Sequence, residues 1–163
     1  MSPMQKPDPV TAADTPAIDL ARSLLASCRF AALAYSDPET GTPGISRIAC
    51  GMGPDGVPVT LISALALHFA ALRATPDCAV MLGEPVARGD PLTHPRLMVR
   101  VKAEFLRAAD RTTWREHWLR DHPKSALYVD FTDFAFVRLL PQSALLNGGF
   151  GRAHRLTAAD LQV

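Results

Sequence analysis

The sequence predicts a mainly β protein, a six-stranded antiparallel β-barrel with flanking helices. About six apolar stretches of strand length are separated by short turns rich in Gly, Pro and Asp. Two stretches with helical spacing are inserted, one after the third strand and one after the fifth. Closure of such a sheet into a barrel would remove its exposed edges, which favours a small closed barrel.

The chain length and the net charge indicate one domain and give no electrostatic reason to expect large anionic partners. At 163 residues, the chain is long enough for one core, which we assign to residues 15–163, with a flexible arm at 1–14. A net charge of +1 gives no reason to expect nucleic acid or an anionic membrane as a partner. The sequence shows no signal-peptide core and no run of membrane-spanning length. Cys28, Cys50 and Cys78 lie among apolar neighbours, which is typical of reduced core cysteines in a cytoplasmic protein.

The first half of the chain predicts one helix and three strands. Thr15 and Pro16 provide an N-cap and a first helical residue, and apolar residues recur at helical spacing as far as about Arg29. Three apolar stretches separated by turns follow: RFAALAYS, ISRIACGMG and VTLISAL. We expect them to form an antiparallel meander.

The second half predicts two helices and the remaining strands. Helical spacing begins after Leu65 and stops at Thr75-Pro76, and CAVMLGE is the fourth strand. The stretch RLMVRVKAEFLRA alternates apolar and polar residues most clearly. Asp110 is the expected cap of the helix TTWREHWLRDHP, and FAFVRLLP and SALLN would complete the sheet.

The glycine-rich stretch LLNGGFGRAHRL is not a nucleotide-binding loop. Gly149-Phe150-Gly151 begins a dinucleotide fingerprint, but His154 occupies the position of the third glycine and no βαβ unit follows. A G-K-[ST] motif is absent, which excludes a P-loop. We expect a tight turn whose glycines adopt positive φ and return the tail toward a ligand or a partner subunit.

Hydrolase and metal sites are not supported. The sequence has no G-x-S-x-G elbow, and its five histidines have none of the local spacings that gather metal ligands. Trp114 and Trp118 lie one helical turn apart, for which core packing or a dimer contact is the preferred interpretation over an aromatic ligand box. No residue is assigned a catalytic role.

Three cations suggest an anion-binding site. Arg47 lies inside an otherwise apolar strand, where a buried charge is costly unless an anion pairs with it. His68 falls in the first turn of a helix, where exposed N–H groups favour an anion. Arg96 begins the fifth strand directly after a proline.

The order of these features resembles the FMN-binding split barrel of the pyridoxamine 5′-phosphate oxidase-like superfamily. Within it, the stretches GISRIACGMGPDGVPVTLISALALHFAALRATPDCAVML, DPLTHPRLMVRV, HPKSALYVDFTDFAFVRLLP and GGFGRA resemble the haem-utilisation (HugZ-like) branch, over about residues 17–156. The resemblance implies a homodimer with one FMN per subunit at the subunit interface.

The resemblance also implies cofactor contacts at seven positions: Ser46, Arg47, Ile48, Ile62, Ser63, His68 and Arg96. Arg47 would donate to the phosphate, and His68 would stand where relatives carry a Lys or Arg facing it. A histidine there predicts weaker, pH-dependent FMN binding. The strand after Arg96 lacks two polar residues that the oxidases direct at the ring. Arg152-Ala153-His154 matches their R-x-H substrate motif, and we interpret that match as coincidence.

Three functions remain open at this point. The leading hypothesis is an FMN-dependent oxidoreductase that acts on an unidentified small molecule. The alternative is a haem-binding protein of haem utilisation or degradation, in which His154 ligates the iron. A third is a flavin-binding module that has lost turnover. Haem binding should disappear in His154→Ala, whereas FMN binding should suffer in Arg47→Ala.

Overall fold

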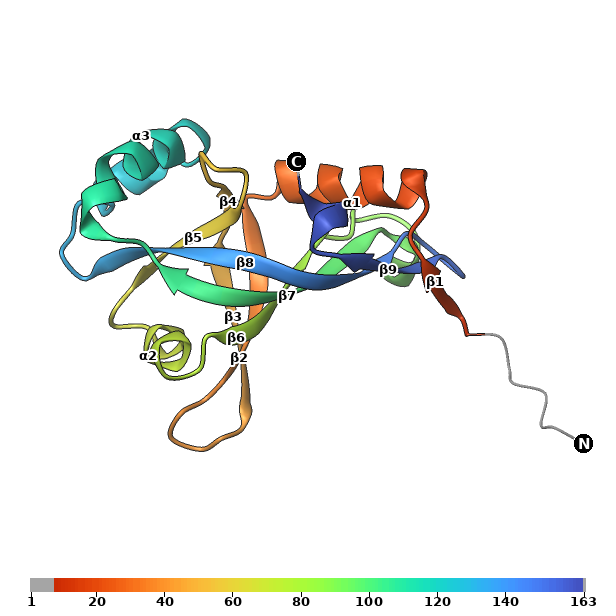
Figure 1. Cartoon of the computed structure of the whole chain (residues 1–163), viewed down its shortest axis with the longest axis horizontal. Helices are drawn as coiled ribbons and strands as arrows, with labels where there is room; N and C mark the ends of the chain where they lie inside the picture. The colour runs from red at the N-terminus through yellow and green to blue at the C-terminus, as the bar shows by residue number, and fades with distance from the viewer. Residues whose placement is uncertain (1–7, 163) are drawn as a thin grey trace, which may run out of the picture.

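Six strand segments surround the main core of the computed structural model, which describes residues 8–162 (Figure 1). They are β2 (Phe30–Ser36), β5 (Pro58–Ser63), β6 (Asp77–Leu82), β7 (Arg96–Phe105), β8 (Phe134–Asn147) and a bent segment made of β3 (Pro43–Ala49) and β4 (Gly51–Met52). All pairings among them are antiparallel, in the order β3-β2-β6-β7-β8-β5-β4. The predicted split-barrel fold is confirmed.

The expected closure of the sheet is wrong, because the bent segment changes its partner at Cys50. β3 pairs with β2 as far as Ala49, whereas β4 pairs with β5 from Gly51 onward. At the change of partner, the Cys50 N–H donates to the Arg29 carbonyl (3.0 Å). No ladder joins β3 to β5 within residues 8–162, so the third strand of the predicted antiparallel meander pairs with the second only through β4.

Two further strands extend the sheet beyond the prediction. β9 (Ala153–Thr157) pairs antiparallel with β8, and β1 (Val10–Ala12) pairs parallel with β9. β1 lies inside the segment predicted as a flexible arm, whose residues 1–7 lie outside the described residues. FAFVRLLP and SALLN form the single strand β8, with an irregularity beside Pro141, which has no N–H to donate.

Three α-helices flank the sheet: α1 (Thr15–Ser27), α2 (Leu67–Ala74) and α3 (Arg111–Asp121). The cap of α1 is Asp14 rather than Thr15, since its Oδ1 accepts from the Ala17 N–H (2.9 Å). Asp110 precedes α3 as predicted, but its carboxylate pairs with Arg107 instead of capping. Short 3₁₀ turns cover Pro91–Thr93, Ala108–Asp110, Pro123–Leu127 and Ala159–Leu161.

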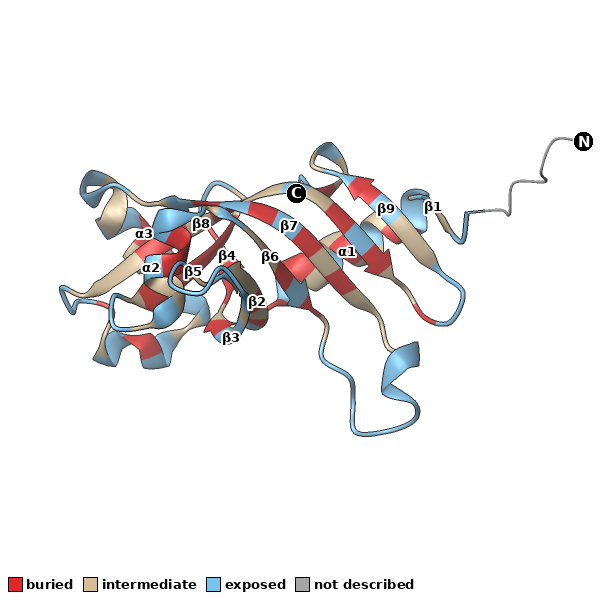
Figure 2. Cartoon of the chain, turned by 90° about the horizontal axis from the view of Figure 1, so that it is seen from below, coloured by how far each residue is buried: buried red, intermediate tan, exposed pale blue. Residues whose placement is uncertain are grey.

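The core is divided into two clusters. The larger lies between α1 and the sheet, and the predicted alternation of β7 is confirmed by buried Leu97, Val99 and Val101 (Figure 2). The smaller lies under α3, where Trp114 and Trp118 are buried, which confirms core packing for this pair. Among the residues that the structure describes, no helix has the length and apolar character needed to span a membrane.

Candidate functional site

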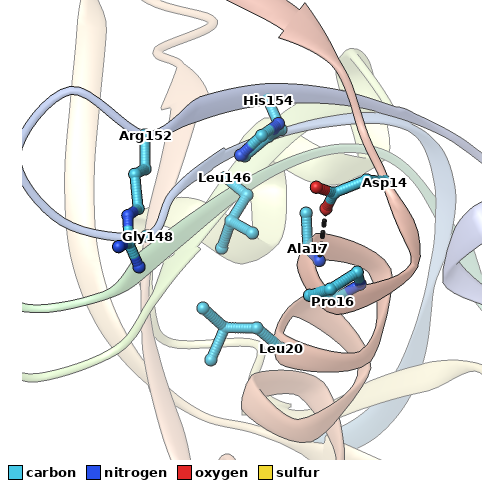
Figure 3. Close-up of a pocket in the computed structure, with 8 residues that line it drawn as sticks. All are labelled: Asp14, Pro16, Ala17, Leu20, Leu146, Gly148, Arg152 and His154. Carbon is cyan, nitrogen blue, oxygen red and sulfur yellow. Dashed lines mark hydrogen bonds between the residues drawn. The ribbon is translucent and has the colours of Figure 1, made fainter.

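A cleft lies where the first turn of α1 faces the turn between β8 and β9 (Figure 3). Its volume is about 310 Å³, at the low end of the range for small-molecule sites. Eight residues line it: Asp14, Pro16, Ala17, Leu20, Leu146, Gly148, Arg152 and His154. The walls are therefore mostly apolar, with one cation, one carboxylate and one imidazole.

The β8–β9 turn shapes one wall of this cleft, as the glycine-rich sequence predicted. Gly149 and Gly151 adopt φ values of 128° and 72°, which side-chain-bearing residues rarely reach. The Gly148 N–H donates to the Arg152 carbonyl (2.8 Å), and the Arg152 N–H donates to the Gly149 carbonyl (3.2 Å). The reversed chain then brings Arg152 and His154 to the cleft wall (Figure 3).

His154 is held by the strands on both sides of it. It lies opposite Leu146 of β8 and opposite Thr11 of β1. Its Nδ1 is 3.2 Å from the Thr11 hydroxyl oxygen. When Nδ1 carries the proton and donates it to this oxygen, Nε2 keeps a free lone pair. Within residues 8–162, Nε2 has no hydrogen-bond partner, so it is available to a ligand.

Arg152 supplies the uncommitted charge of the cleft. In the described part of the chain, its guanidinium has no hydrogen-bond or ion-pair partner and is exposed. The carboxylate of Asp14 is already engaged at the start of α1 and offsets the positive end of the helix. Arg152 is therefore the group that would meet an anionic substituent of a ligand.

The structure changes the argument for Arg47. We expected a buried charge, but Arg47 is exposed on β3, with its guanidinium 5.7 Å from the centre of the Phe30 ring. Side chains alternate between the two faces of a strand. Ile48 and the half-buried Ser46 therefore point to the opposite face, and Ile48 belongs to the main core.

The remaining predicted contacts are engaged within the chain. Ile62 is buried, and the Ser63 hydroxyl donates to Asp133 (2.6 Å). His68 is half-buried beside Tyr35, and burial lowers its pKa, so without a phosphate it is neutral at pH 7. Arg96 begins β7 as predicted and donates to the Leu92 carbonyl (3.0 Å).

The seven predicted positions do not line one surface of a single chain. The pairing register places Arg47 and Arg96 on the outer face of the sheet, opposite to Ser46 and Ile48. In contrast, sequence reasoning did not find Thr11, Asp14 or Leu20. Thr11 is separated from His154 by 143 positions, and no local pattern reveals a contact over that distance.

Comparison with known proteins adds a curated relative and solved structures. No protein-family model matches the chain. The non-canonical heme oxygenase HOZ of Arabidopsis thaliana, named as chloroplastic, is 32% identical over 109 residues, which cover 66% of this chain and 32% of that protein. The chain thus spans about a third of the length of this relative.

Among solved structures, a heme binding protein from Mycobacterium smegmatis is 27% identical, with a TM-score of 0.82. The match covers 93% of this chain and 62% of that chain. Another solved chain is 40% identical, with a TM-score of 0.85, and the match covers 93% of this chain and 99% of that one. The similarity therefore extends over nearly all of the described residues.

Proposed function

The chain belongs to the haem-utilisation branch of the pyridoxamine 5′-phosphate oxidase-like split-barrel superfamily, and from this premise we propose that it binds haem. The proposed site is the cleft between α1 and the β8–β9 turn, with His154 as the iron ligand. Relatives named as a heme binding protein and as a heme oxygenase support this choice of ligand. Haem binding, which was the alternative function in the sequence analysis, thereby replaces FMN-dependent oxidation as the main hypothesis.

The observation that carries the proposal is the environment of His154. Its free Nε2 lies at a mostly apolar cleft, and Thr11 can fix the tautomer that a metal ligand needs. Within residues 8–162, no three His, Cys, Asp or Glu side chains are arranged to hold a metal ion. A single histidine suits an iron that brings its other ligands with it, and haem iron does so.

The rest of the cleft fits the remaining parts of haem. The half-buried Leu20 and the exposed Pro16 offer apolar contact to a macrocycle, and the guanidinium of Arg152 can pair with a carboxylate at its edge. A cleft of about 310 Å³ accommodates only part of such a ligand. One chain would hold one side of the haem and leave the other side outside the cleft. Bound haem would supply redox-active iron, and the residues named here would bind and orient it.

FMN is kept as the second candidate cofactor because of Arg47. Its guanidinium is exposed and, among the described residues, has no carboxylate partner. A phosphate brought to the outer face of the sheet would find this charge and Arg96 on the same side.

We also propose a homodimer formed through the outer face of the sheet. One row across six strands contains Ala32, Met81, Met98 and Leu145 between an arginine at each end, Arg47 and Arg155. Met81 is 50% exposed, and nearby Ile45 is 76% exposed. An apolar centre with a charged rim is typical of a protein interface.

The cytoplasm remains the proposed location, because the three cysteines are free.

The test is titration of the untagged protein with haemin, followed by the Soret band. We expect saturable binding that is lost in His154→Ala. The matched control is His117→Ala, because His117 lies on α3, at the far end of the molecule from β9 (Figure 1). Equal binding by His154→Ala and the wild type would contradict the proposal. Saturable FMN binding that is lost in Arg47→Ala would support the second candidate instead.

A further inference from the structure

Two cysteines that are distant in the sequence meet at the end of α1. Cys28 directly follows α1, and Cys50 lies where β3 gives way to β4. Their Sγ atoms are 3.5 Å apart, and both thiols are free. The proposed haem function involves neither of them.

Of the two cysteines, only Cys28 reaches the surface. A second cleft, of about 410 Å³, lies beside the C-terminal part of α1. Cys28 lines it together with Leu24, Arg29 and Phe30. Cys28 keeps 8% of its surface exposed, whereas Cys50 is fully buried behind it. A small reagent that enters this cleft would therefore reach Cys28 first.

The surroundings assign different roles to the two sulfurs. The sulfur–sulfur contact with Cys50 lowers the pKa of Cys28 against the opposing effect of burial, and the charge of Arg29 lowers it further. The nearby carboxylate of Asp121 acts in the opposite direction. The pKa of Cys50 is raised by the same contact with Cys28 and by burial. Cys28 is thus the more readily ionised thiol, and Cys50 remains protonated beside it.

A disulfide requires a sulfur separation of about 2.05 Å, so the thiols must move closer than they are now. Cys50 lies at the break between β3 and β4. Its neighbour Ala49 pairs with β2, and its other neighbour, Gly51, pairs with β5. Gly51 follows it directly and has no side chain to obstruct the shift.

We propose that Cys28 and Cys50 form a peroxide-reactive thiol pair that closes to a reversible disulfide. The Cys28 thiolate attacks one oxygen of a hydroperoxide, the O–O bond breaks, and the departing oxygen takes up a proton and leaves as an alcohol, or as water from hydrogen peroxide. The sulfur of Cys50 then attacks the Cys28 sulfenic acid and releases water. Two thiols thus supply the two electrons that reduce one hydroperoxide.

The test uses the haem-free, fully reduced full-length chain and a stoichiometric amount of hydrogen peroxide. We expect the loss of two of the three free thiols and a mass lower by two hydrogen atoms. A peptide that joins Cys28 to Cys50 should appear in the digest under native conditions. Modification mainly at Cys78, or no loss of thiols in the folded protein, would overturn the proposal.

Variants separate the attacking thiol from the resolving one. In Cys50→Ala, dimedone should trap a sulfenic acid on Cys28, and Cys28→Ala should leave Cys50 reduced. The matched control is Cys78→Ala, which should form the disulfide as the wild type does. Burial and the charge of Asp77 raise the pKa of Cys78 to about 11, so it should react slowly. Should a variant fail to fold, the linked peptide of the wild type still decides the proposal.

Discussion

The substitution Thr11→Val removes the hydroxyl that contacts His154 and leaves most of the shape of the side chain. Valine is well suited to a strand, and Thr11 lies in the short edge strand β1, so the stability of the fold should change by less than about 0.5 kcal/mol. The effect should therefore fall on the ligand site. Without the Thr11 oxygen, the Nδ1 proton of His154 loses its acceptor and the ring loses a fixed orientation.

The expected size of the effect follows from the geometry of this contact. Loss of a partner that orients a metal-ligating histidine typically costs about 10–100-fold in affinity. The contact between Thr11 and His154 is long, at 3.2 Å, and exposed to water, which can replace part of it. We therefore expect the lower end of the range, about a tenfold higher Kd for haem, or about 1.4 kcal/mol.

The assay is haemin titration of the wild type, Thr11→Val and Thr11→Ser, with thermal unfolding of each apo-protein. Thr11→Ser keeps the hydroxyl and should bind like the wild type. If Thr11→Val binds haem with unchanged affinity while His154→Ala does not bind it, the proposed orientation of the ring by Thr11 is wrong. If Thr11→Ser loses as much affinity as Thr11→Val, packing of the methyl group is responsible instead.

Three further predictions concern the fold and its assembly. Gly83→Ala should lower the free energy of unfolding by about 2–4 kcal/mol in urea denaturation, because Gly83 has φ 93° and an added Cβ would overlap the Pro95 carbonyl oxygen. Burial lowers the pKa of His122 below its usual value near 6.5, so the unfolded state binds its proton first as the pH falls. Stability should therefore decrease from about pH 7 toward pH 5, and less steeply in His122→Phe, which can keep the stacking on Trp118. Met81→Asp should convert the proposed dimer to a folded monomer in light scattering, and a monomeric wild type would contradict the dimer.

The elements of this fold could be predicted from the sequence because their signals are local. The alternation after Arg96 specifies a strand with Leu97, Val99 and Val101 on its buried face, and the structure confirms it. The closely spaced glycines of the β8–β9 turn likewise predict positive φ, and the structure confirms it at Gly149 and Gly151. The one-residue error at the cap of α1 has a local cause too, since Asp14 and Thr15 are both good capping residues.

Contacts between distant parts of the chain were decided by the tertiary structure. The break of the ladder at Cys50 depends on which strands pair with β3 and β4. Local sequence does not reveal these partners, so the sequence suggested a closed meander. Arg47 was expected to be buried because its neighbours are apolar, yet the register of β3 with β2 directs it outward. A residue's face is set by the pairing of its whole strand, and a one-residue change in register would reverse it.

By itself, the sequence determined the split-barrel class, the positions of most helices and strands, and His154 as a candidate iron ligand. Only the tertiary structure placed Thr11 and α1 beside that histidine and brought Cys28 to within 3.5 Å of Cys50. Short-range spacing encodes secondary structure, because it depends on neighbours along the chain. Clefts and paired thiols depend on segments that come together only on folding, and no local sequence pattern reveals those contacts.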